Sequence, residues 1–391
     1  MARTGMRLST NRILTTHVGS LPRSTTVTDT VFAREQGKVI SRDEFTRVIG
    51  DAVCDVVAAQ VRAGLDVVSD GEMSKISYAT YIKDRLTGFD GDSTRDPPAD
   101  LQDYPSYLKK LANAGGTPSY RRPRCVGPIA VKSLEPLDDD LSMFRFALEK
   151  VAHAGAAPAE AFMNAASPGV IALFQPNDFY PTHESYLEAL AEAMRPEYEA
   201  IVGAGFVLQI DSPDLGLGGH TLFKGRPLAD YVRLATLHVE ILNHALRNCP
   251  ADRLRMHVCW GNYEGPHHHD VPMDVVLPIA LRAKPQGLLF EASNPRHAHE
   301  WTVFRDARIP DDRVLIPGVL DSVSNFIEHP LLVAERIEKF AAIVGRERVI
   351  AGTDCGFSTF AGFGVVDADI VYAKLAAMAE GARIASTRLW T

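Results

Sequence analysis

The sequence has few cysteines, no long apolar run and no excess of positive charge, and each absence excludes a class of protein. Five cysteines among 391 residues are too few, and odd in number, for a disulfide framework. The N-terminus lacks the apolar segment of a signal peptide, so we expect a cytoplasmic location. No run of about 20 apolar residues exists, which predicts no contact with a membrane interior. The net charge of -8 gives no electrostatic reason to bind nucleic acid.

The sequence also lacks the glycine-rich fingerprints GxGxxG and GxxxxGK[ST], so a nucleotide-binding fold has little support. What is present is an ordinary globular composition, with 46% hydrophobic and 23% charged residues. A chain of this length is large enough for one large domain or two smaller ones.

Short apolar runs recur along the chain, and most are followed by a helical pattern. The runs cover residues 12–20, 65–72, 160–167, 206–213, 254–261, 287–293, 314–321 and 349–355. Helical patterns lie between them, for example over 44–63, 186–201, 228–247 and 331–344. Eight such alternations predict an α/β fold, a (β/α)8 TIM barrel, with a doubly wound open sheet as the alternative.

The spacing of the predicted strands is uneven, because residues 73–159 separate the second from the third. Residues 88–116 are polar and rich in Asp, Pro and Gly, and 120–129 have the pattern of an extra strand outside the barrel. We therefore expect one catalytic barrel over residues 1–391, with an inserted loop and extra strand at 88–130. Long excursions of this kind often act as lids or partner surfaces.

Polar residues stand at the C-terminal ends of the predicted strands, where barrel enzymes keep their chemistry. They are His17, Glu72, Asp211, His257, Cys259, Glu291, Asp321 and Cys355.

Four of these residues, one histidine, two cysteines and one carboxylate, form the ligand set of a zinc site. His257 and Cys259 are two apart on a predicted strand, so their side chains point to the same side. Glu291 and Cys355 end two other strands. Ligands spread over three strand ends favour an open catalytic site, whereas a structural zinc site would show local spacing. Zinc deprotonates a bound thiol, and the pattern therefore indicates an enzyme that activates a thiol.

Seven motifs in this order resemble the catalytic domain of cobalamin-independent methionine synthase. They are TTHVGSLP (15–22), SDGE (69–72), QIDSP (209–213), HVC (257–259), FEAS (290–293), PGVLD (317–321) and DCG (354–356). The resemblance covers roughly residues 10–385. It implies the single-barrel branch of the family, which also includes epoxyalkane:coenzyme M transferases.

The resemblance assigns a role to most of the strand-end residues. It implies four Zn2+ ligands: His257, Cys259, Glu291 and Cys355. It implies a homocysteine-contacting loop at Val18, Gly19 and Ser20. It also implies that Glu72 and Asp211 hold the substrate ammonium, and we expect these two acids to lie away from the thiolate ligands.

Two departures from the family pattern concern the alkyl donor. Folate-using members have a histidine, proposed as a proton donor, two residues after the Asp that matches Asp321, and here that position is Val323. The first motif carries His17 in place of Thr or Val. We therefore expect methyl-folate to be a weak donor, and we treat His17 and Asp321 as candidate catalytic residues.

The leading hypothesis is zinc-dependent methyl transfer to a small thiol, most simply homocysteine. The first alternative is attack of coenzyme M on an epoxide, which would need cationic groups for the sulfonate. A metal-free barrel resembling uroporphyrinogen decarboxylase is the second. The partners expected are a small-molecule thiol and an alkyl donor. The histidines at 267–269 follow Gly265 and Pro266 and are expected on a surface or rim loop.

Overall fold

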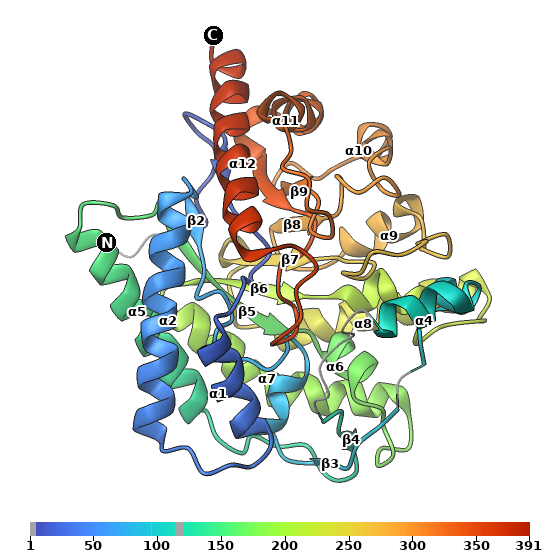
Figure 1. Ribbon diagram of the computed structural model, residues 1–391. Helices are drawn as coiled ribbons and strands as arrows, with labels where there is room; N and C mark the ends of the chain where they lie inside the picture. The colour runs from blue at the N-terminus through green and yellow to red at the C-terminus, as the bar shows by residue number, and fades with distance from the viewer. Residues whose placement is uncertain (1–4, 95, 114–120) are drawn as a thin grey trace.

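The computed structural model describes residues 5–94, 96–113 and 121–391. Eight parallel strands form one sheet in the order β1-β10-β9-β8-β7-β6-β5-β2, at the centre of Figure 1. They are β1 (Leu14–Thr15), β2 (Val67–Val68), β5 (Glu160–Ala166), β6 (Val207–Asp211), β7 (Leu254–His257), β8 (Gly287–Phe290), β9 (Val314–Leu320) and β10 (Ile350–Thr353). The Asp66 N–H donates to the Thr15 carbonyl at 3.2 Å, which joins the two ends of the sheet. Each strand falls within a predicted apolar run, and the TIM barrel is confirmed.

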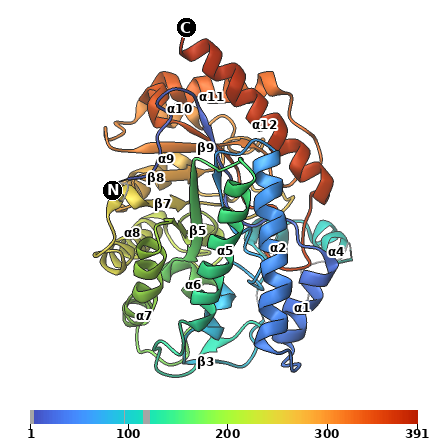
Figure 2. The same ribbon diagram turned by 90° about the vertical axis from the view of Figure 1, so that its left-hand side faces the viewer.

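Helices surround the sheet, as Figures 1 and 2 show. They are α1 (Thr25–Glu35), α2 (Arg42–Arg62), α5 (Glu135–His153), α6 (Pro168–Phe174), α7 (His183–Gly203), α8 (Leu228–Ala245), α9 (Met273–Ala280), α10 (Trp301–Asp306), α11 (Pro330–Val344) and α12 (Ala368–Leu389). Short 3-10 turns lie at Thr80–Asp84, Pro213–Leu215, Leu217–His220, Ala251–Arg253 and Arg346–Arg348. The four helices predicted from the sequence are all present. Within the described residues, none of the helices has the length and apolarity needed to cross a lipid bilayer.

Side-chain capping fixes where several of these helices begin. Ser41 accepts the Glu44 N–H at the start of α2, and Thr182 and Ser185 form a capping box at the start of α7. Such caps satisfy amide groups that the first helical turn leaves without partners. The caps therefore fix the first residues of α2 and α7.

The core has two layers. Apolar side chains on the outer face of the strands pack against the helices, and a smaller group fills the barrel itself, including Leu14, Val67, Phe162 and Ile316. A buried arginine, Arg255, completes this inner layer. Its guanidinium lies 3.5 Å from the centre of the Phe162 ring and donates to the His17 carbonyl at 2.8 Å. The loop after β1 is therefore held from inside the barrel.

The excursion between β2 and β5 contains more structure than the predicted loop and strand. Its strands β3 (Phe89–Asp90) and β4 (Arg124–Cys125) form an antiparallel pair outside the barrel. Within the segment 120–129, where an extra strand was predicted, the described residues form a strand at Arg124 and Cys125, and Tyr120 lies outside the described residues. Two helices, α3 (Ala99–Gln102) and α4 (Pro105–Asn113), were missed, because they are short and lie in a segment rich in Pro and Asp.

Candidate metal centre and substrate pocket

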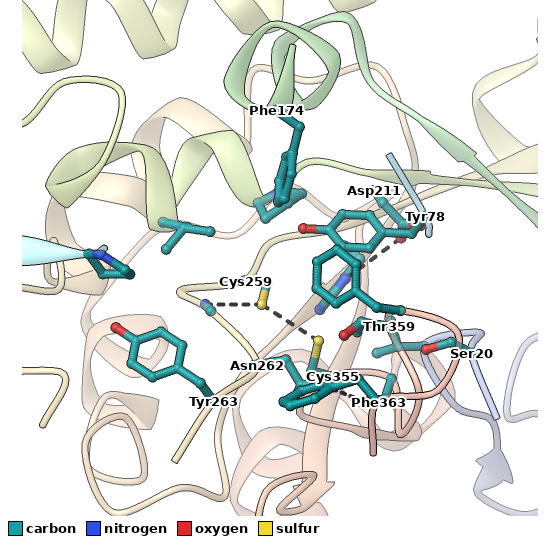
Figure 3. Close-up of a pocket in the computed structure, with 18 of the residues that line it drawn as sticks. Ser20, Tyr78, Phe174, Asp211, Cys259, Asn262, Tyr263, Cys355, Thr359 and Phe363 are labelled. Atoms are coloured by element: carbon teal, nitrogen blue, oxygen red, sulfur yellow. Dashed lines mark hydrogen bonds and ion pairs between the residues drawn. The ribbon is translucent and has the colours of Figure 1, made fainter. Parts of the chain in front are cut away.

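Three of the four predicted metal ligands converge at the mouth of the barrel. His257 ends β7, Cys259 follows two residues later, and Cys355 follows β10. One potential ligand atom from each lies within 4.8 Å of the others, and all three residues are buried. The two sulfur atoms face each other in Figure 3 at a separation of 3.6 Å. Two thiols and an imidazole at this spacing form a donor set for a soft divalent ion such as Zn2+.

The pKa of the Cys259 thiol supports the view that this group of residues suits a cation. The hydrogen bond with Cys355, together with burial, holds the pKa of the Cys259 thiol well above its ordinary value. Two neighbouring thiolates repel each other in a buried site, and a bound divalent cation removes that repulsion. A cation bound beside Cys259 would therefore oppose the upward shift of its pKa.

Glu291, the fourth predicted ligand, lies next to this group but is not brought into it. Its Oε1 accepts the Trp260 N–H at 2.8 Å, and its Oε2 accepts from the side chain of Asn294. These bonds tie the end of β8 to the loop that begins at Cys259. Each carboxylate oxygen of Glu291 thus accepts one hydrogen bond and keeps a second lone pair with which it could coordinate a metal.

Asp354, which precedes Cys355, holds the loop after β8. Its carboxylate accepts the backbone N–H groups of Ala292, Ser293 and Asn294 at 2.7–2.9 Å. This residue belongs to the motif DCG (354–356), for which no role of the aspartate was predicted. In the sequence, only its place beside Cys355 pointed to a role in the site. The structure shows that Asp354 positions the residues that follow Glu291.

Glu72 has the features of a functional carboxylate. Its backbone φ of +59° is unusual for a residue other than glycine, and its N–H donates to Asp70 at 3.0 Å. The side chain is buried and lines the pocket, and its Oε2 has no hydrogen-bond partner among the described residues. Burial, with a contribution from Asp211, raises the pKa of Glu72 to about 7. A strained, buried and incompletely paired carboxylate favours a cationic ligand.

Asp211 lines the same pocket but lies closer to the metal group than the sequence suggested. Its carboxylate accepts from Asn164 and Gln209, each at 2.9 Å, and its Oδ1 lies 3.7 Å from Nδ1 of His257. Asp211 was expected to lie away from the thiolate ligands, and the structure places it beside the histidine of the predicted ligand set. The reason is register, since Asp211 and His257 are paired residues on neighbouring strands β6 and β7.

The loop at 18–20 reaches the pocket as expected. Val18 and Ser20 line it, and Gly19 lies between them with φ +150°. A Cβ atom at Gly19 would lie 2.4 Å from Oδ1 of Asn164, so only glycine fits there. The loop is thus packed directly against the side chain that also binds Asp211.

His17 and Asp321 are not among the residues that line the pocket. The Nε2 of His17 forms a 2.8 Å hydrogen bond with Gln60 on α2, and burial lowers the pKa of His17 to about 3. Asp321 accepts the Val323 N–H at 3.0 Å within its own turn. The structure therefore does not bring either candidate catalytic residue together with the metal ligands.

A pocket of about 570 Å³ opens above the metal group. Its walls carry Tyr78, Phe174, Leu217, Phe360 and Phe363, several of which surround the two sulfurs in Figure 3. The excursion contributes a further set of lining residues: Asp96, Pro97, Pro98, Leu101, Leu108, Leu111 and Arg122. The excursion therefore covers the pocket, and sequence reasoning identified the segment without identifying these side chains.

The histidine triplet divides between interior and surface. His267 is buried, stacks on Tyr263, and its N–H donates to Asp100 of α3 at 2.9 Å. His268 and His269 are exposed and share Oδ2 of Asp103 at 2.9 and 2.6 Å. The expected rim position is thus right for two of the three. His267, with Asp100, joins the excursion to the loop after β7.

Known proteins similar to this chain span nearly its whole length. It is 25% identical over 381 residues to a methionine synthase of Saccharolobus solfataricus, covering 96% of this chain and 95% of the relative. It is 24% identical over 378 residues to a methionine synthase of Sulfolobus acidocaldarius, covering 96% and 93%. The fold is similar to that of a B12-independent methionine synthase from Shewanella sp. W3-18-1, with a TM-score of 0.71, 18% identity and coverage of 97% and 99%.

Fold and site together define a (β/α)8-barrel protein with a thiol-rich donor set beneath a deep pocket. Residues 13–106 match the family model described as the catalytic domain of cobalamin-independent synthase. Together with the relatives named above, this match supports the cobalamin-independent methionine synthase family as the one that the chain is most similar to among these comparisons.

Proposed function

We propose that this protein transfers a methyl group to a thiol in a zinc-dependent reaction, with homocysteine as the acceptor and methionine as the product. The observation that carries the proposal is the convergence of His257, Cys259 and Cys355 beside a pocket that also contains two acids. The names of the curated relatives agree with this activity.

His257, Cys259 and Cys355 are the residues that would hold the zinc ion, with Glu291 proposed as an exchangeable fourth ligand. Bound zinc would keep the acceptor thiol deprotonated near neutral pH, where a free thiol is mostly protonated. Oδ1 of Asp211 lies 3.7 Å from Nδ1 of His257, where its negative charge would stabilise the imidazole beside a bound metal. The bonds from Glu291 to Trp260 and Asn294 keep the loop after Cys259 in place.

Glu72 and Asp211 support homocysteine over coenzyme M as the acceptor. Both carboxylates are buried in the pocket, and Glu72 has an oxygen available for a further donor. An ammonium group supplies such donors and a compensating charge, and its binding favours the ionised form of Glu72. The sulfonate of coenzyme M would instead meet two acids of like charge. The loop at 18–20 borders the same region and is proposed to contact the amino acid part of the acceptor.

The decisive experiment measures which thiol is alkylated and by which donor. Zinc-loaded protein is incubated with homocysteine, cysteine or coenzyme M against methyl-folate, methylcobalamin or an epoxide, and the S-alkylated product is identified by mass spectrometry. We expect S-methylation of homocysteine that is lost after chelation and restored by zinc. The same assay is run on Cys355→Ser, which alters a proposed zinc ligand. Its matched control is Cys249→Ser, which alters a buried thiol outside the site. Alkylation of coenzyme M alone would replace this proposal with the epoxide reaction.

A further inference from the structure

The wall of the pocket above the metal group is mainly apolar and aromatic. Phe174 and Tyr78 pack edge to face at 5.4 Å between ring centres, and Phe360 lies 6.3 Å from Phe174. Leu101, Leu108 and Leu111 of the excursion line the same pocket. Aromatic and leucine side chains thus make up much of its lining, which suits an apolar ring-sized group.

The charges that line the pocket do not suit an anionic donor. Among the described lining residues, the ionisable groups other than the metal ligands are three acids, Glu72, Asp96 and Asp211, and one base, Arg122. The proposed acceptor ammonium accounts for Glu72 and Asp211. Asp96 and Arg122 then remain, both on the excursion, and their opposite charges sum to zero. A donor that carries several carboxylates, such as a polyglutamylated folate, would find one cationic side chain and one acid of like charge at this entrance.

The position of the excursion is also fixed by hydrogen bonds. The excursion is held against the loop after β7 by buried contacts, since Asp100 accepts from the Tyr263 hydroxyl at 2.8 Å and from the His267 N–H at 2.9 Å. Tyr263 itself lines the pocket. The apolar face of the excursion is therefore part of a formed binding site rather than a loop that happens to pass above it.

From these observations we infer that the alkyl donor of this enzyme is an aromatic molecule without anionic groups, whose ring lies between the Phe174 side and the leucines of the excursion. The inference rests on the proposed function and specifies its donor. The donor class is an aryl methyl ether, and in the reaction the acceptor sulfur forms a bond to its methyl carbon. The bond from that carbon to the leaving oxygen of the donor breaks, and the oxygen keeps the electron pair and takes a proton from water. No other reactant is needed.

A series of probes with the same ring and methyl ether but different charge tests the inference. The probes are 4-methoxytoluene (neutral), 4-methoxybenzylamine (cationic) and 4-methoxybenzoate (anionic), and dissociation constants are measured by saturation-transfer NMR on zinc-loaded protein, with and without homocysteine. We expect the neutral probe to bind at least about tenfold more tightly than the anionic one. We expect the cationic probe to lose affinity when homocysteine occupies the acids.

Variants connect the result to the residues named. Phe174→Ala and Leu108→Ala should each weaken the neutral probe about tenfold, while Phe146→Ala, on the exposed face of α5, should leave it unchanged. Asp96→Asn should narrow the difference between the neutral and anionic probes. Equal or tighter binding of the anionic probe, or tighter binding of triglutamyl methyl-folate than of the neutral probe, would overturn the inference.

The two proposals fail in different ways. If homocysteine does not bind but the charge order of the probes holds, the acceptor assignment is wrong and the donor class stands. If homocysteine binds and the charge order is reversed, the donor class is wrong and the acceptor assignment stands.

Discussion

The sulfur atoms of Cys259 and Cys355 lie 3.6 Å apart, although 96 positions separate the two residues. Their strands, β7 and β10, are not neighbours, since β8 and β9 lie between them in the sheet. Only a sheet curved into a barrel brings the ends of such strands together. The candidate metal centre therefore depends on closure of the barrel. Because the barrel does not depend on the candidate ligands in turn, replacing one of them should leave the fold intact.

Cys259→Ser and Cys355→Ser should each remove bound zinc, because a serine hydroxyl is a hard and much weaker ligand than a thiolate. Elemental analysis of the purified variants should fall from one zinc per chain to near zero, with an unchanged circular dichroism spectrum.

Two controls address other sources of zinc. Cys249→Ser alters a buried cysteine distant in sequence from the site, and Asp103→Ala disrupts the exposed group of Asp103, His268 and His269. Both should keep one tightly held zinc. Full zinc content in Cys259→Ser and Cys355→Ser would show that the metal assignment is wrong.

Glu72→Gln should weaken binding of homocysteine while zinc content stays the same. The variant removes a charge but keeps the shape of the side chain, and a hydrogen bond to a charged group contributes about 1.5–3 kcal/mol, or roughly 10- to 100-fold in the Michaelis constant. Steady-state kinetics with metal analysis of the same sample measures both quantities. Glu188→Gln, on the exposed side of α7, is the matched control. An unchanged Michaelis constant in Glu72→Gln would contradict the proposed role.

His17→Gln should make the stability of the protein less sensitive to acid. The folded-state pKa of His17 is lowered to about 3 by burial, so the unfolded chain binds a proton below about pH 6.5 that the folded chain does not. Falling pH between about 6.5 and 3 therefore destabilises the wild-type fold through this residue, by up to about 1.4 kcal/mol per pH unit. Urea midpoints at pH 7, 6 and 5 should decline more steeply for the wild type than for the variant.

The same variant tests the role that the sequence suggested for His17. Because its ring is hydrogen-bonded to Gln60 and does not line the pocket, we expect turnover at pH 7 to change little. General acid catalysis contributes about a hundredfold or more. A loss of that size in a folded, zinc-loaded His17→Gln protein would support proton donation by His17 after all.

Asp270→Asn should destabilise the loop that joins the excursion to β7. Asp270 accepts hydrogen bonds from His267 and His297, both at 2.9 Å, and although burial acts in the opposite direction, these bonds raise the pKa of the two histidines to about 9 and about 10. Both are therefore charged at pH 7, and the variant leaves them without their shared carboxylate, at a cost of about 3 kcal/mol.

The pH dependence provides the check. A raised histidine pKa adds stability that is fully present below about pH 6.5 and is lost as the pH rises through about 9 to 10. The difference in urea midpoint between wild type and Asp270→Asn should therefore shrink between pH 7 and pH 10. Asp274→Asn, at an exposed position in α9, should show no difference at either pH.

The barrel could be predicted from the sequence because parallel strands covered on both faces leave a recognisable apolar pattern. Strands buried on both faces, such as β6 and β9, appear as apolar runs, and the polar residue that ends each run marks the carboxyl edge of the sheet. His257 and Cys259 could be paired for the same reason, since spacing of two on a strand gives a common side. These features depend on local pattern, which the sequence carries in full.

The remaining features of the site depend on contacts between segments distant in sequence. The distance from Asp211 to His257 follows from the register of β6 on β7, and the orientation of His17 follows from the position of Gln60 on α2. Local pattern sets neither. Likewise, the sequence marked the excursion as a long polar segment, but only the folded chain places Leu101 and Leu108 over the pocket. The sequence thus determined the fold and marked the candidate metal ligands, while tertiary packing decided the shape and charge of the pocket, because those depend on which distant side chains meet.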